Sequence, residues 1–166
     1  MADREQGTVL IAYDGSEQAK LAIVEAGRVL GGGRRAVVLI VREPIETFVF
    51  SGLGGGGTLD PATVSAMQES AQNEATVIAE EGAALARQAG FAAEPRVEVG
   101  ASPWQEIVAV AEDLGAQVIA IGSRGRTGLP KVLLGSVASA VAQHSRRSVL
   151  IVHREAGDGA DEEAAI

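Results

Sequence analysis

Short apolar runs alternate with longer amphipathic stretches along most of this 166-residue chain. The apolar runs cover residues 8–13, 36–41, 96–99, 117–121 and 148–152. Residues 8–13 show little alternation of apolar and polar side chains, which is typical of a strand buried on both faces, whereas residues 96–99 alternate, as suits an edge strand. The five runs therefore predict five strands.

The stretches between these runs carry apolar residues at three- and four-residue spacing, the period of an amphipathic helix. Their start signals are Ser16, Asp60-Pro61, Ser136 and a capping box at Ser102-Pro103-Trp104-Gln105. The signals predict helices over residues 16–30, 60–90, 102–114 and 136–144. Regular alternation of strand and helix predicts a single-domain α/β fold, an open parallel five-stranded sheet with helices on both faces.

Composition narrows the class of protein. Apolar residues make up 46% of the chain and aromatic residues 3%, so we expect a core of Val, Ile, Leu and Ala. A formal net charge of −8 argues against a nucleic-acid partner or an anionic membrane surface, since both favour a basic face. No apolar run is long enough to cross a bilayer.

The two ends of the chain and its lack of cysteine give three further expectations. Residues 1–7 resemble no secretory signal, so we expect a cytoplasmic protein. Without cysteine there is no disulfide and no thiolate nucleophile. Residues 154–166 are rich in Ala, Gly, Asp and Glu, and we expect them to form a disordered acidic tail after a domain that spans residues 1–153.

The richest chemistry lies between the predicted strand at 117–121 and the predicted helix at 136–144. Glycines at 122, 125 and 135 and the hydroxyl of Ser136 border this loop, and its cations Arg124, Arg126 and Lys131 face no acidic residue within it. A helix start with unpaired N–H groups suits an anion such as phosphate. Two other interpretations stay open: an ordinary helix start with Ser136 as its cap, and a solvated basic loop.

The spacing of these residues is Gly-x2-Gly-x9-Gly-Ser, which is neither a Walker A loop nor the Gly-x-Gly-x-x-Gly dinucleotide fingerprint. It resembles the nucleotide-binding signature of the universal stress protein family, and the order of elements extends the resemblance over residues 8–153. The resemblance implies the strand order 3-2-1-4-5. It also implies a homodimer formed through the strand at 148–152, whose apolar edge no charge interrupts.

The same resemblance implies a site for ATP with Mg²⁺ or Mn²⁺. The residues that it places there, from the adenine end to the phosphates, are Ala12, Asp14, Val41, Ile121, Gly122, Ser123, Arg124, Gly125, Arg126, Thr127, Gly135, Ser136 and Val137. Val41 would offer main-chain groups to the base, and Asp14 would accept hydrogen bonds from the adenine or ribose end or help to hold the cation. In isolation, Asp14-Gly15-Ser16 is more often a turn and a helix cap.

Enzymatic interpretations find little support in the residues. There is no Gly-x-Ser-x-Gly elbow, no cluster of His, Asp and Glu at metal-ligand spacing, and no evident general base in the loop, so we expect at most weak ATP hydrolysis. Two hypotheses remain. The first is an ATP-binding regulatory module of the stress response, and the second is a stress-induced dimeric interaction protein of the same fold that binds no nucleotide.

Overall fold

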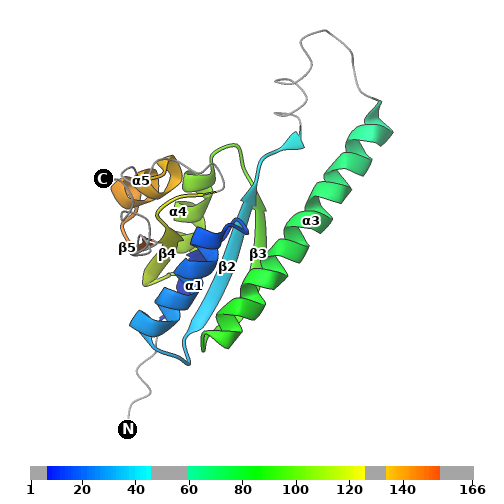
Figure 1. Cartoon of the computed structure of the whole chain (residues 1–166). Helices are drawn as coiled ribbons and strands as arrows, with labels where there is room; N and C mark the ends of the chain where they lie inside the picture. Colours follow the sequence, from blue (N-terminus) through cyan, green and yellow to red (C-terminus); the bar gives the residue numbers. More distant parts are fainter. Residues whose placement is uncertain (1–6, 46–59, 126–133, 154–166) are drawn as a thin grey trace, which may run out of the picture.

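The computed structural model describes residues 7–45, 60–125 and 134–153. They form one α/β domain around a five-stranded parallel sheet (Figure 1). The elements are β1 (Val9–Ala12), α1 (Glu17–Leu30), β2 (Arg35–Arg42), α3 (Pro61–Gln88), β3 (Ala92–Val99), α4 (Pro103–Asp113), β4 (Val118–Gly122), α5 (Ser136–His144) and β5 (Ser148–Val152). The acidic tail predicted at 154–166 lies outside the described residues.

The strand order is β3-β2-β1-β4-β5, as the family resemblance implied. β1 pairs in parallel with β2 on one side and with β4 on the other, so the direction in which the chain builds the sheet reverses between β1 and β4. In open sheets of this kind, ligands bind beyond the carboxyl ends of the strands at such a reversal. The ends of β1 and β4 are therefore the place to look for a site.

Two apolar clusters fill the space between the sheet and its helices. One joins the sheet to α1 and α3 and is rich in alanine from α3, and the other joins the sheet to α4 and α5. Along β2, Ala36, Val38 and Ile40 belong to the first cluster, while Val37 and Leu39 belong to the second. Successive side chains thus point to opposite faces, as they must in a strand.

β3 is longer than the sequence predicted. It begins at Ala92 rather than at residue 96 and includes Pro95, which pairs with Val38 of β2. The composition of residues 92–95 gives little strand signal, but pairing along the whole of β2 extends the strand. Proline is tolerated because β3 is an edge strand, where an N–H on the outer side is not needed.

Two of the predicted caps behave differently. Ser16 caps α1 as predicted, since its Oγ accepts a hydrogen bond of 3.2 Å from the N–H of Ala19. Ser102 is the N-cap residue of α4, but its side chain makes no capping bond, so the predicted capping box is wrong. The N–H of Gln105, which that side chain would have accepted, donates to the Ser102 carbonyl at 3.1 Å instead.

Candidate functional site

The chain turns sharply after β1, at Asp14-Gly15-Ser16. One carboxylate oxygen of Asp14 accepts a 3.0 Å hydrogen bond from the N–H of Ser16, and Gly15 has a φ of +79°, a region that favours glycine. This confirms the interpretation of the segment as a turn and a cap. The other oxygen faces the loop after β4, because a β-carbon at Gly125 would lie 3.0 Å from Asp14 Oδ2. Asp14 and Gly125 are thus neighbours, one from each side of the reversal.

Gly122, the last residue of β4, is explained by packing. A β-carbon there would lie 3.0 Å from both the carbonyl carbon and the carbonyl oxygen of Gln18, in the first turn of α1. Its backbone is also free of positive φ. The absence of a side chain at Gly122 therefore lets the first turn of α1 pack closely against the end of β4.

The backbone of Ser123 is hydrogen-bonded both to the end of β5 and to the start of α5. Its N–H donates to the carbonyl of Val152 in β5 at 2.8 Å, and its carbonyl accepts from the N–H of Gly135 at 2.8 Å. The side chain is 1% exposed, and its hydroxyl has no hydrogen-bond partner among the described residues. A buried hydroxyl without a partner is costly, so we expect an ordered water or another polar group beside this oxygen.

The start of α5 is open to an anion. Gly135, not Ser136, is the N-cap residue, and glycine offers no side-chain oxygen to the helix. The first intrahelical bond of this turn runs from the N–H of Ser139 to the Gly135 carbonyl at 2.9 Å. The N–H groups of Ser136, Val137 and Ala138 therefore have no intrahelical acceptor, which is the arrangement that binds phosphate at other helix starts.

An apolar surface lies beside these polar groups. Ala12 and Ile121, near the ends of β1 and β4, belong to the cluster beneath α4 and α5, and Val41 and Val137 pack against it. Four of the predicted site residues thus share one face of the sheet. Ala12 and Ile121 are buried, with exposed fractions of 8% and 6%, so a purine base could contact only their edges at the ends of the strands.

The backbone of Val41 points toward the end of β1. The pairing of β1 with β2 stops at Ala12 and Leu39, and the last bond runs from the N–H of Tyr13 to the Leu39 carbonyl at 2.9 Å. Backbone groups of a strand face alternate sides, so the N–H and C=O of Val41 face the same side as those of Leu39. They lie beyond the last paired residue of β1, where a base could reach them.

Three residues of the loop that the sequence singled out lie outside the described residues: the cations Arg126 and Lys131, and the polar Thr127. Among the residues that are described, no group of three or more His, Asp and Glu side chains could hold a metal ion. In the same part of the chain, no helix is at once long and apolar enough to cross a membrane.

Sequence reasoning missed a polar cluster next to the site. Tyr13 donates from its hydroxyl to Glu81 of α3 at 3.3 Å, and Lys20 of α1 lies 3.2 Å from Glu17 and 3.3 Å from Glu81. Burial, aided by the charge of Glu81, raises the pKa of Tyr13 to about 12, so this phenol stays neutral and donates at physiological pH. The available signal was Gly82 on the buried face of α3, where a β-carbon would lie 2.6 Å from the Tyr13 ring.

The fold and the site together describe an α/β protein whose strand order reverses between β1 and β4, with a helix start without a side-chain cap at that reversal. The family model "Universal stress protein family" matches residues 6–153, and the chain belongs to this family. It is 32% identical over 158 residues to the universal stress protein MJ0577 of Methanocaldococcus jannaschii, covering 89% of this chain and 94% of that one. It is 31% identical over 145 residues to YxiE of Bacillus subtilis, covering 87% of this chain and 97% of that one.

Solved structures agree. The structure of MJ0577 superposes with a TM-score of 0.72 at 27% identity and covers 91% of this chain and 98% of that one. A universal stress protein solved in complex with cAMP has a TM-score of 0.58 at 25% identity, with 89% and 96% of the two chains covered.

Proposed function

We propose that this protein binds ATP with a divalent cation at the ends of β1 and β4, as a cytoplasmic regulatory module of the stress response with at most weak ATPase activity. The main support for the proposal is that groups suited to phosphates and groups suited to a base lie close together where the strand order reverses. The open start of α5 suits phosphates, and the exposed backbone edge of Val41 beside an apolar face suits a base. The related protein with cAMP adds support for an adenine ligand.

The backbone of Val41 favours adenine over guanine. An N–H beside a C=O matches the N1 acceptor and the N6 amino donor of adenine. Guanine carries a donor at N1 and an acceptor at O6, so it places its donor and acceptor in the opposite order. The base would lie against the edges of Ala12 and Ile121, which present no competing polar side-chain group.

The phosphates would lie along the N–H groups of Ser136, Val137 and Ala138, with the hydroxyls of Ser123 and Ser136 within the same region. The cation would be held mainly by phosphate oxygens, which Mg²⁺ prefers together with one or two carboxylates. Asp14 can supply one such oxygen, because only its other oxygen is engaged by Ser16. Hydrolysis is expected to be weak, since the polar residues of the loop after β4 are Ser, Arg, Thr and Lys, none of which is an evident general base for water.

Calorimetric titration with ATP-Mg and GTP-Mg tests the proposal. We expect ATP to bind about 5- to 150-fold more tightly, because a mismatched donor and acceptor pair costs about 1–3 kcal/mol. Asp14→Asn keeps an oxygen for the Ser16 N–H and removes the charge. If Asp14 holds the cation, this variant loses the Mg²⁺ dependence of ATP binding. If its free oxygen accepts from the ribose, the amide nitrogen that replaces that oxygen cannot accept, and ATP binding weakens with or without Mg²⁺. Equal affinity for the two nucleotides, or none for either, would refute the proposal.

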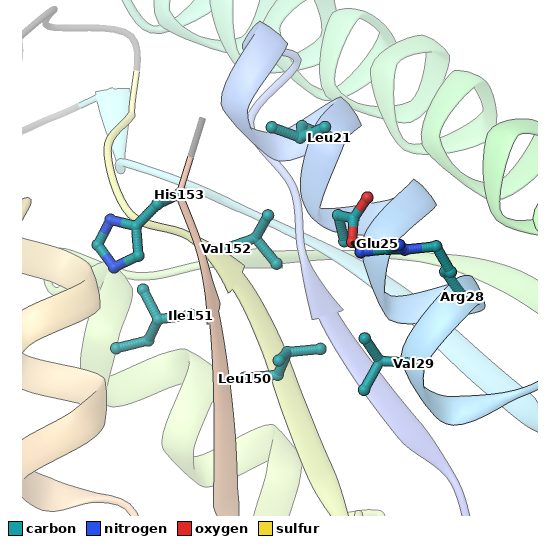
Figure 2. Close-up of a pocket in the computed structure, with 8 residues that line it drawn as sticks. All are labelled: Leu21, Glu25, Arg28, Val29, Leu150, Ile151, Val152 and His153. Carbon is teal, nitrogen blue, oxygen red and sulfur yellow. Dashed lines mark hydrogen bonds and ion pairs between the residues drawn. The ribbon is translucent and has the colours of Figure 1, made fainter. Parts of the chain in front are cut away.

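The second candidate function, a dimeric interaction protein without nucleotide, draws on a groove beside β5. Figure 2 shows this groove, about 640 Å³ in volume, between α1 and β5. It is lined by Leu21, Glu25, Arg28, Val29, Leu150, Ile151, Val152 and His153. Among the described strands β5 pairs with β4 alone, so its outer edge has no strand partner in this part of the chain, and Val29 is 60% exposed. Pairing with β5 of a second copy would satisfy this edge.

Sedimentation velocity tests the homodimer. Leu150 and Ile151 pack partly against the core, so a charge on α1 is a cleaner probe of the interface. Val29→Glu places a charge in the groove and should weaken dimerisation at least about tenfold. Val77→Glu, on α3 and 70% exposed, is the matched control and should leave the dimer intact. A wild type that sediments as a monomer at high concentration would contradict the dimer.

A native mass spectrum of the purified protein separates the two candidate functions. The first predicts a bound adenine nucleotide, and the second predicts a dimer without one.

A further inference from the structure

β2 continues past the last residue pair that it forms with β1. Ile40, Val41 and Arg42 pair only with β3, and the N–H of Gly100 donates to the Arg42 carbonyl at 3.0 Å. On the other side, β1 has already turned at Asp14. The strand end that carries Val41 is therefore held by the sheet from one side alone.

Arg42 supplies a second tie from its side chain. Even-numbered residues of β2 face α1 and α3, and the Arg42 Nε donates to Gln72 Oε1 of α3 at 3.0 Å. Both residues are half-buried, which makes this bond stronger than an exposed contact. Gln72 is itself held in the helix, since its carbonyl accepts from the Thr76 hydroxyl at 2.8 Å.

The bond lies where α3 leaves the sheet. The buried residues of α3 begin at Ala75, and none of residues 61–74 is buried. Figure 1 shows these N-terminal turns running on past the ends of the strands. Arg42 therefore joins the end of β2 to α3 at Gln72, within one turn of Ala75, the first residue of the helix that the core buries.

We infer that Arg42 is a positioning residue for base recognition: its bond to Gln72 fixes the end of β2, so that the Val41 N–H and C=O distinguish adenine from guanine. The inference rests on the proposed nucleotide site. Hydrogen-bond readout depends on accurate placement of both groups, whereas phosphate affinity arises at α5, which Arg42 does not touch. Loss of the bond should therefore reduce selectivity for the base more than affinity for the triphosphate.

The test compares ATP-Mg and GTP-Mg affinities by calorimetry for four variants. Arg42→Met keeps the apolar stem and removes the donor, and Gln72→Leu removes the acceptor. Each should weaken ATP binding about fivefold and change GTP binding little. The ratio of the two affinities then falls about fivefold, which is the typical contribution of one hydrogen bond. Gln72→Glu keeps an acceptor for Arg42 and should retain the wild-type ratio of affinities.

Arg35→Met is the matched control. Arg35 begins the same strand and pairs with Glu94 at 3.3 Å, but both side chains are largely exposed and lie at the opposite end of β2. It should leave the ratio unchanged. An unchanged ratio in Arg42→Met and Gln72→Leu, or an equal loss for ATP and GTP, would overturn the inference while the proposed function stands. A wild type that binds neither nucleotide would overturn both.

Discussion

Two helices start beside the strand reversal, and their first turns are built in opposite ways. At α1, Ser16 Oγ accepts from the N–H of Ala19, and Asp14 accepts from the N–H of Ser16. At α5, the N-cap residue is Gly135, which has no side chain to offer. After β1, the N–H groups of Ser16 and Ala19 thus have side-chain acceptors, while the N–H groups of Ser136, Val137 and Ala138 have no side-chain cap among the described residues.

Packing strengthens the contrast. Gln18 in the first turn of α1 lies directly against Gly122, so that helix start is closed by β4. Ser136 at the start of α5 is exposed, and the buried hydroxyl of Ser123 nearby has no partner in the described structure. Of these two neighbouring helix starts, the first has a side-chain cap and the second has none among the described residues, so we expect a phosphate to bind at the second.

The largest effect is expected from a variant that gives α5 a side-chain cap. Gly135→Asp gives this helix a carboxylate that accepts from its first-turn N–H groups and repels phosphate. We expect ATP affinity to fall at least about 100-fold, or about 2.7 kcal/mol. Calorimetry measures the loss. Gly135→Ala is the control for the β-carbon, which would lie 3.3 Å from the Ser123 carbonyl oxygen and should cost much less. ATP binding by a folded Gly135→Asp protein at wild-type strength would contradict the phosphate site.

A second variant tests the closed side. Gly122→Ala pushes a methyl group against the backbone of Gln18, and overpacking of this kind typically costs about 1–3 kcal/mol of stability. Urea unfolding should show this loss. In Gly125→Ala the new methyl group meets only the Asp14 side chain, which can move, so stability should hardly change. If the two variants unfold at the same urea concentration, Gly122 does not have the packing role assigned here.

The smallest effect is expected from removing the internal cap of α1. Ser16→Ala leaves the N–H of Ala19 without its acceptor and should lower the free energy of unfolding by about 1 kcal/mol. ATP affinity should stay within about twofold, because that N–H takes no part in phosphate binding. Thermal unfolding and calorimetry on the same sample check both statements. A large loss of ATP affinity would indicate that the phosphates bind at the start of α1, and it would contradict the proposed site at α5.

Much of the fold could be predicted because its signals are local. β5 and α5 have the predicted bounds, since an apolar run and a helical period mark them clearly. β3 began earlier than predicted because its first residues, including Pro95, owe their conformation to pairing with β2, which no local pattern reports. The Ser102 cap failed for a similar reason, as a backbone carbonyl had already taken the relevant N–H.

For the site, the structure brings several of the predicted residues together, and it assigns packing or capping positions that the sequence does not show. The sequence placed glycines at 122 and 135 in one phosphate loop, yet Gly122 makes room for α1 and Gly135 leaves a helix uncapped. It found neither the Tyr13–Glu81 bond nor the Arg42–Gln72 bond, since each joins residues far apart in the chain. Contacts between distant side chains depend on how the elements pack, and a single sequence carries little information on that.

A solution NMR titration of the ¹⁵N-labelled protein with ATP-Mg tests most directly whether the phosphates bind at the start of α5. We expect the largest amide shifts at Ser136, Val137 and Ala138, and hardly any shift of the Ala19 amide in the first turn of α1. Shifts of equal size at both helix starts, or none at α5 while ATP binds, would contradict the proposed phosphate site.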